Sequence, residues 1–313
     1  MKVAILGAAG AIGKATEQVL RERGVDVRVV GRDVRKLAGF ANSEQVAADV
    51  ATREGCDRAL AGVDAAVYSL GLPYTKNAFA TYVPMMELCL AAARAAGVRQ
   101  LVLITNVYPY GRPQTPRIGE DHARVTCSVK GEHRKRQEDL VLAADSHDGL
   151  RTLSLRLPNF YGPDAELSLS AMIFKAALAG KKADLLGPID TPQELVYTPD
   201  VGPVVADLIA RPEAFGRAYN YAGPGDTTFR DFATRIYRAV GAEPRFRVAS
   251  PGLVKVMGLF SGLMRELSEM MYLQQTPILL DDTRLRGVLP ELKKTSYDEG
   301  IRLTVEALRH RQA

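Results

Sequence analysis

The sequence predicts an α/β protein in which a doubly wound parallel sheet is followed by a smaller C-terminal α/β domain. Two observations lead to this fold class. Short apolar runs alternate with helical stretches as far as Leu157, and the alternation weakens after Gly162-Pro163. Parallel strands need crossover helices between them, and strands that are buried on both faces form continuous apolar runs.

The expected elements follow one another at α/β spacing. Strands are expected at residues 2–6, 25–30, 45–48, 65–69, 100–105 and 151–157. Helices are expected at residues 11–23, 85–96 and 125–144, and a glycine follows each of the first two, as is common where helices end. Beyond residue 163, helices are expected at 169–179, 231–240 and 253–272, among isolated strands and prolines.

The composition excludes several classes of protein. Of the 313 residues, 47% are hydrophobic and 25% are charged, which excludes disordered and collagen-like chains. Three scattered cysteines are too few for a disulfide framework or a zinc site, and the four histidines lack metal-ligand spacing. We therefore expect no metal centre.

Charge and hydropathy indicate neither a membrane nor a nucleic-acid partner. No stretch reaches the ~18 uninterrupted apolar residues of a membrane span, and the N-terminal apolar run is too short for a secretory signal. The net charge of +5 is too small to imply nucleic acid, and the basic stretch 130–136 is interpreted as the solvated face of a helix. We expect a cytoplasmic protein with a small-molecule substrate, and a homodimer stays open.

A glycine-rich turn lies between the first expected strand and the first expected helix. Its glycines permit a tight turn and a close approach of the backbone to a pyrophosphate, and the helix N-terminus adds free N–H groups. The predicted contacts are Gly7, Gly10, Ala11, Ile12 and Gly13. This context predicts a dinucleotide-binding Rossmann domain over 1–163, to which segments of about 190–222 return, and an interleaved substrate-side domain over 164–313.

Further motifs occur in order along the chain. They are Asp49-Val50, Ser69-Leu70-Gly71, Thr105-Asn106-Val107-Tyr108-Pro109-Tyr110-Gly111, Arg156-Leu157-Pro158-Asn159-Phe160-Tyr161-Gly162-Pro163, Tyr197-Thr198-Pro199-Asp200-Val201 and Tyr219-Asn220-Tyr221-Ala222-Gly223. With the glycine spacing, they resemble the extended short-chain dehydrogenase/reductase superfamily, which includes NAD(P)-dependent nucleotide-sugar epimerases and dehydratases. The resemblance covers most of the chain.

The resemblance implies roles for these positions. It implies that Asp49 and Val50 contact the adenine of the cofactor. Further cofactor contacts are expected from Leu70, Gly71, Thr105, Pro158 and Asn159, and substrate contacts from Tyr74, Tyr108, Asn159 and Tyr161.

The end of the second expected strand favours NADP(H) over NAD(H). An acidic residue there usually accepts hydrogen bonds from the adenosine ribose, whereas an arginine accommodates a 2′-phosphate. Arg32 occupies this position, and its guanidinium can bind a phosphate through two parallel hydrogen bonds. Asp33 follows it directly, which keeps NAD(H) as the alternative.

The catalytic positions depart from the superfamily's pattern, which uses a tyrosine and a lysine four residues apart on one helix face and a Ser/Thr on the fifth strand. Lys130 stands at the lysine position, where the resemblance implies a contact with the nicotinamide ribose, and Thr126 stands at the tyrosine position. The Ser/Thr position falls on Asn106, with Thr105 just before it. A threonine cannot exchange a proton as a phenol can at neutral pH. Tyr108, Tyr110, Tyr161 and Thr126 itself are candidate proton donors.

Three functions are compatible with these residues. The main interpretation is an NADP(H)-dependent reductase of a carbonyl or activated alkene in a small hydrophobic molecule, with a non-standard proton donor. The alternatives are a nucleotide-sugar-type epimerase or dehydratase and a nonenzymatic NADP(H)-sensing protein. The methionine-rich segment 253–272 is expected to pack in the core or at a dimer contact, with a lid over the substrate and a membrane-surface helix as alternatives. Cys127 is expected to be buried.

Overall fold

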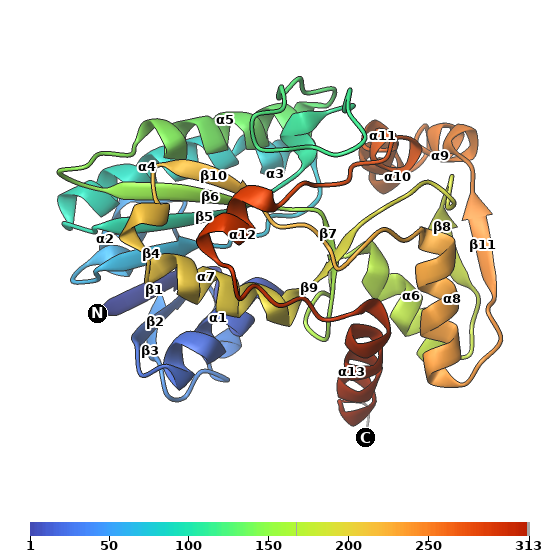
Figure 1. Ribbon diagram of the computed structural model, residues 1–313, viewed down its shortest axis with the longest axis horizontal. Helices are drawn as coiled ribbons and strands as arrows, with labels where there is room; N and C mark the ends of the chain where they lie inside the picture. Colours follow the sequence, from blue (N-terminus) through green and yellow to red (C-terminus); the bar gives the residue numbers. More distant parts are fainter. Residues whose placement is uncertain (167, 312–313) are drawn as a thin grey trace.

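A seven-stranded sheet forms the centre of the computed structural model, which describes residues 1–166 and 168–311 (Figure 1). Its strand order is β10-β6-β5-β4-β1-β2-β3, and every neighbouring pair is parallel. The strands are β1 (Lys2–Leu6), β2 (Asp26–Gly31), β3 (Glu44–Ala47), β4 (Ala65–Tyr68), β5 (Gln100–Asn106), β6 (Arg151–Leu157) and β10 (Arg217–Asn220). The predicted fold class is confirmed.

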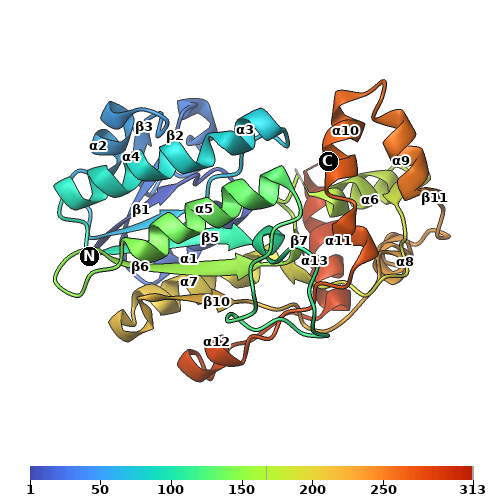
Figure 2. The ribbon, with the colours of Figure 1, turned by 90° about the horizontal axis from the view of Figure 1, so that it is seen from above.

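Helices cover both faces of this sheet, as Figure 2 shows from above. Val3 and Ile5 of β1 pack on one face with α1 (Ala11–Glu22) and α7 (Val201–Ile209). Ala4 and Leu6, which point to the opposite face, pack with α2 (Arg53–Leu60), α4 (Tyr82–Ala95) and α5 (Val129–Ala143). Because successive side chains of a strand point to opposite faces, burial of all four explains why the strand is apolar throughout.

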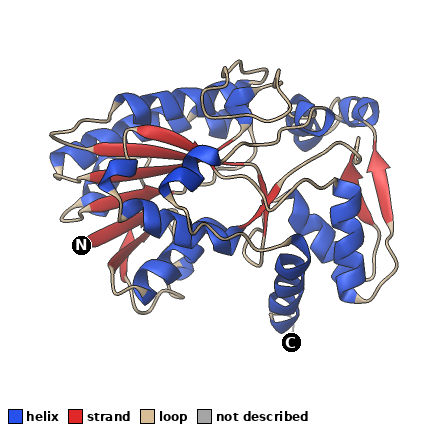
Figure 3. Cartoon of the chain, in the orientation of Figure 1, coloured by secondary structure: helices blue, strands red, loops and turns tan. Residues whose placement is uncertain are grey.

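A second core lies beside the carboxyl ends of the strands. It is built from α6 (Leu169–Leu178), α8 (Phe229–Val240) and α13 (Tyr297–His310), with two small parallel sheets (Figure 3). The sheets pair β7 (Asn159–Tyr161) with β9 (Leu195–Tyr197), and β8 (Ala183–Leu186) with β11 (Phe246–Ala249). Between residues 190 and 222 the chain also returns to the main sheet, where α7 covers one face and β10 forms an edge.

The C-terminal helix α13 was not among the expected elements, although its ends carry ordinary helix signals. The Ser296 side chain accepts a hydrogen bond from the backbone nitrogen of Glu299, and Asp298 lies in the first turn. Several other elements are short. They include α3 (Lys76–Ala80), α12 (Thr283–Val288) and the 3₁₀ turns Val34–Lys36, Tyr108–Tyr110, Thr198–Asp200 and Pro212–Ala214.

The expectation of a single helix at residues 253–272 is wrong. The segment instead forms α9 (Pro251–Met257), α10 (Gly262–Glu269) and α11 (Tyr272–Gln275). The Ser261 side chain starts α10 by accepting a hydrogen bond from Met264, and α9 and α10 pack so closely that a Cβ atom at Gly258 would lie 3.2 Å from the Arg265 Cα. Glycine and a capping serine therefore break the apolar run.

Two further expectations need correction on α5. The helix begins at Val129 rather than 125, because Ser128 caps it by accepting a hydrogen bond from the Gly131 nitrogen. The basic stretch 130–136 is not wholly solvated, because Lys130 is 0% exposed and Arg134 is 4% exposed. No helix in the described part of the chain is long and apolar enough to cross a membrane.

Candidate functional site

The strand order reverses between β1 and β4, and ligands of doubly wound sheets bind at the carboxyl ends of the strands beside such a point. The glycine-rich turn after β1 lies there. Gly7 has a φ of +91°, and a Cβ atom at Gly13 would lie 2.5 Å from the Gly7 carbonyl oxygen. A Cβ atom at Gly7 would lie 3.0 Å from the backbone nitrogen of Leu70. Neither glycine has room for a side chain.

The helix that follows this turn begins without a side-chain cap. Gly10 is the N-cap residue of α1, and no side chain in the described part of the chain caps it. Thr52 and Ser128, by contrast, cap α2 and α5. Uncapped N–H groups at the positive end of a helix dipole favour an anion. The turn from Gly7 to Gly13 therefore fits the pyrophosphate of a dinucleotide.

At the carboxyl end of β2, Arg32 and Asp33 differ in how they are engaged. Arg35 donates hydrogen bonds to the Asp33 carboxylate from Nε at 3.0 Å and from Nη2 at 3.1 Å, and it holds the pKa of that carboxyl below its usual value. Arg32 lies outside this ion pair and is exposed. The acidic group that could bind a ribose is thus occupied by Arg35.

The predicted adenine and nicotinamide contacts lie at neighbouring strand ends. Asp49 and Leu70 are half-buried, Val50 is buried and Gly71 is exposed. One oxygen of Asp49 accepts a hydrogen bond from the Ala51 nitrogen at 3.1 Å, which fixes the turn after β3. These four residues remain predicted cofactor contacts.

β5 ends at Thr105 and Asn106, whose side chains serve different purposes. Asn106 Oδ1 accepts a hydrogen bond from the Tyr108 nitrogen at 3.1 Å and so holds the turn after the strand. The Thr105 hydroxyl is buried, and none of the described residues forms a hydrogen bond with it. Because buried hydroxyls nearly always have a partner, the Thr105 hydroxyl has a hydrogen bond to offer to a ligand or a water molecule.

Three predicted site residues lie together at this edge: Lys130, Tyr74 and Tyr108. The two phenol oxygens are 3.5 Å apart, and Lys130 Nζ lies 5.1 Å from the centre of the Tyr74 ring. Burial raises the pKa of both phenols above its ordinary value of 10. Both therefore carry their protons at neutral pH.

Two glutamates that the sequence interpretation missed cover Lys130. The Lys130 ammonium donates hydrogen bonds to Glu269 Oε2 at 2.8 Å and to a carboxylate oxygen of Glu266, both from α10. The signal in the sequence was a pair of acidic residues one helical turn apart within an apolar segment. Only the folded chain brings them to a lysine more than 130 positions away.

Thr126 does not share a helix face with Lys130, so that expectation is wrong. Thr126 precedes the cap of α5, and its hydroxyl donates a hydrogen bond to Glu132 Oε2 at 2.9 Å. The side chains one turn apart on the buried face are Lys130 and Arg134. Arg134 donates to the carbonyl oxygen of Ile104 in β5 at 3.1 Å.

Tyr110, a candidate proton donor, is instead part of a buried network. Its hydroxyl donates to Asn220 Oδ1 at 2.8 Å and accepts from Arg156 Nη1 at 2.6 Å. Arg156 Nε donates to Glu138 Oε1 at 2.7 Å. The network joins β6, β10 and α5 and gives Tyr110 a structural role.

The substrate contact predicted for Tyr161 conflicts with its position. Tyr161 is 0% exposed, and its ring packs edge to face on Phe232 at 5.0 Å within the second core. Asn159, two residues earlier, is half-buried and donates to Gln193 Oε1 at 3.1 Å, and Pro158 is buried. Only Asn159 of the three retains partial exposure.

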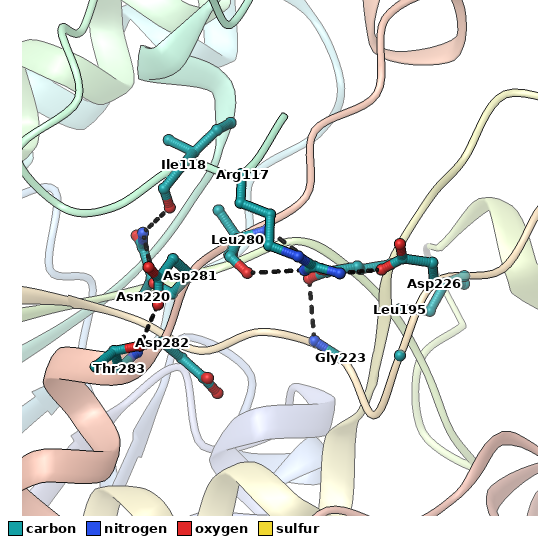
Figure 4. A network of polar contacts seen from close by, with 12 residues as sticks. Arg117, Ile118, Leu195, Asn220, Gly223, Asp226, Leu280, Asp281, Asp282 and Thr283 are labelled. Atoms are coloured by element: carbon teal, nitrogen blue, oxygen red, sulfur yellow. Dashed lines mark hydrogen bonds and ion pairs between the residues drawn. The ribbon is translucent and has the colours of Figure 1, made fainter. Parts of the chain in front are cut away.

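A buried carboxylate, Glu194, lies in a further polar network that joins the loop before α12 to the segment after β10. Its oxygens accept hydrogen bonds from the nitrogens of Leu280 and Gly223, each at 3.2 Å. Figure 4 shows Arg117 extended between Leu280 and Asp226 in the same network. Burial raises the pKa of Glu194 to about 7.

The methionine-rich segment and Cys127 differ from expectation. Met270 and Met271 are buried, whereas Met257 is 41% exposed, so the segment is only partly core. Cys127 is exposed rather than buried, and it lines a surface pocket with Ser268 of α10.

Comparison with known proteins gives one family match and several structural neighbours. A sequence model described as the NAD dependent epimerase/dehydratase family matches residues 3–222. A curated relative, the UDP-glucose 4-epimerase of Azospirillum brasilense, is 27% identical over 179 residues. That match covers 52% of this chain and 50% of the relative, so the chain spans about half the length of the curated relative it matches.

The similar solved structures cover nearly the whole chain. The UDP-glucose 4-epimerase of Thermotoga maritima, solved with UDP-glucose, has a TM-score of 0.83 at 19% identity and full coverage of both chains. The UDP-glucose 4-epimerase of Thermus thermophilus, a complex with NAD, has a TM-score of 0.82 at 21% identity, with 99% of each chain covered. A dTDP-glucose 4,6-dehydratase of Streptomyces venezuelae has a TM-score of 0.82 at 20% identity, with 100% of this chain and 98% of that chain covered. At these identities the likeness is one of fold.

Proposed function

Since the chain belongs to the NAD-dependent epimerase/dehydratase family, we propose that it binds a nicotinamide dinucleotide and uses it for epimerase- or dehydratase-type chemistry on a hydroxyl-bearing small molecule of the nucleotide-sugar type. The observation that carries this proposal is the turn from Gly7 to Gly13, which is packed too tightly for side chains and opens into an uncapped helix at the strand reversal. When bound, the dinucleotide supplies a hydride acceptor and donor.

The proposed contacts divide along the dinucleotide. Backbone N–H groups of the turn bind the pyrophosphate, and Asp49 and Val50 contact the adenine. The unpartnered Thr105 hydroxyl and Lys130 serve the nicotinamide side. The further proposed lining residues are Gly10, Ala11, Ile12, Leu70, Gly71, Pro158 and Asn159.

Tyr108 is the proposed proton donor toward the substrate. It is half-buried, its phenol lies 3.5 Å from that of Tyr74, and both phenols lie at the end of β5 beside Lys130. Thr126 is replaced in this role, because it lies before α5 and its hydroxyl donates a hydrogen bond to Glu132. A phenol exchanges a proton with a substrate oxygen far more readily than an aliphatic hydroxyl does.

We further propose that NADP(H) is preferred to NAD(H). Arg35 occupies the Asp33 carboxylate through two hydrogen bonds, so the acidic group that would favour a bare ribose is already neutralised. Arg32 is exposed at the same strand end and supplies a guanidinium for a 2′-phosphate. This preference also favours the second candidate function, an NADPH-dependent reductase of a carbonyl or activated alkene.

One set of incubations separates the functions. The protein is mixed with UDP-glucose and dTDP-glucose in the presence of NAD⁺ or NADP⁺, and products are identified by mass spectrometry and chromatography. An isomer or dehydration product without net change in the dinucleotide is the expected result. Net oxidation of NADPH by ketones, quinones or enones would favour the reductase, and dinucleotide binding without any turnover would favour a sensor.

A further inference from the structure

The segment 250–269, which contains α9 and α10, is held to the rest of the protein in an unusual way. None of the residues of α10 is buried, and Val254 is the only buried residue of α9. Leu259 is 71% exposed and Phe260 is 89% exposed. Apolar burial, which stabilises most docked helices, therefore contributes little to holding α10 in place.

Charged hydrogen bonds hold α10 instead. Glu269 accepts hydrogen bonds from the Val129 nitrogen at 2.6 Å and from Lys130 Nζ at 2.8 Å. Glu266 accepts one from the Lys76 nitrogen at 3.2 Å and another from Lys130. Both carboxylates thus converge on the Lys130 ammonium and on two backbone N–H groups at helix starts.

The two ends of this segment are anchored by strand pairing and by burial in a core, whereas α10 itself is not. β11 pairs with β8 just before residue 250, and Met270 and Tyr272 are buried in a core cluster just after α10. Between these anchors Val254 fixes α9 in the core, whereas α10 is held by the group of carboxylates around Lys130.

This contact covers the edge of the site. Among the residues that the structure describes, Lys130 is the one lysine that is buried, at 0% exposure. Its ammonium also lies over the Tyr74 ring, so α10 closes the space beside both residues.

We propose that α10 is a lid held by charge, whose release frees the Lys130 ammonium for the contact with the dinucleotide proposed above. This inference rests on the proposed function for the identity of the ligand, but the lid itself is tested without one. Release of α10 exposes little apolar surface, and the charge-assisted hydrogen bonds that it breaks are replaced by contacts of Lys130 with the ligand.

The first test measures how fast Lys130 reacts with an amine reagent. The double variant E266Q/E269Q and the wild type are acetylated with N-hydroxysuccinimidyl acetate, and peptides are quantified by mass spectrometry. We expect Lys130 in the double variant to react at least about 10-fold faster, since the loss of even one charge-assisted hydrogen bond corresponds to about that factor. The exposed residue Glu291 provides the control variant, E291Q, which should match the wild type.

Lys294 provides the internal control, because it is a half-buried lysine paired with a different carboxylate, that of Asp282. Its reaction rate should stay constant in every variant. An unchanged rate at Lys130 would overturn the proposal, and so would an equal rise at Lys294, which would reveal general loosening of the fold.

The second test locks the lid. Ser268 of α10 and Cys127 line the same pocket, and Cys56 and Cys89 are buried, so an S268C variant can be cross-linked to Cys127 with a short bis-maleimide. We expect Lys130 to react more slowly in the cross-linked protein than in the unlinked variant. Equal rates would contradict a moving lid. A parallel titration of the wild type with NADP⁺ distinguishes failure of the proposed function from failure of the lid proposal. If the wild type binds no dinucleotide, the proposed function is refuted, while the labelling result for the lid still stands.

Discussion

Gly13 offers the sharpest perturbation of the proposed dinucleotide site. In Gly13→Ala, the new Cβ atom would lie 2.5 Å from the Gly7 carbonyl oxygen and 2.7 Å from the Ala8 Cα. Both neighbours are backbone atoms, so the start of α1 must move away from the turn. Overpacking of this kind costs roughly 1–3 kcal/mol.

The same movement displaces the N–H groups proposed to bind the pyrophosphate. We expect the dissociation constant for NADP⁺ to rise by about 10-fold or more, since each 1.4 kcal/mol of lost binding energy is a factor of ten. Fluorescence titration with NADPH measures the affinity, and thermal denaturation measures the cost in stability. Gly39→Ala is the matched control, because a Cβ atom there would meet nothing within 4 Å. Dinucleotide binding by Gly13→Ala at wild-type affinity would refute the assignment of this turn.

Three other changes test separate parts of the account. Arg32→Ala should weaken the affinity for NADPH by about 10-fold and change the affinity for NADH by no more than about 2-fold, because only NADPH loses a bidentate phosphate contact. Equal losses of affinity for both dinucleotides would contradict the 2′-phosphate role. Tyr108→Phe should lower turnover by about 100-fold or more at unchanged dinucleotide affinity, as for loss of a general acid, and full activity would exclude Tyr108 as the donor. Because burial raises the pKa of Glu194 from 4.5 to about 7, the stability that this group contributes is present below pH 4.5 and is lost as the pH rises through 7. The free energy of unfolding should therefore fall by about 3 kcal/mol across that window, and the fall should be absent in Glu194→Gln; urea denaturation at several pH values measures it.

The main sheet could be predicted from the sequence because its signals are local. Val3, Ile5 and their neighbours are apolar on both faces of the strand, and glycines end the first helices. The break in the segment 253–272 was missed, because the prediction followed the apolar periodicity and did not weigh Gly258 or the Ser261 cap. Periodicity alone could not distinguish one long helix from three short ones.

Part of the site could be predicted from the family's motifs. Tyr108 and Lys130 were placed from motif positions, Tyr74 was expected to contact the substrate, and the three lie together. The partners of Lys130 were missed, because Glu266 and Glu269 come from α10, far away in the sequence. Thr126 was misplaced for the opposite reason: a local capping contact from Ser128 decides that α5 starts three residues after it.

A crystal structure with bound NADP⁺ tests the central claim most directly. The account predicts the pyrophosphate against the backbone N–H groups of Ala11, Ile12 and Gly13, and the 2′-phosphate within hydrogen-bond distance of the Arg32 guanidinium. A dinucleotide bound elsewhere on the protein, or crystals that take up none at saturating concentration, would contradict it.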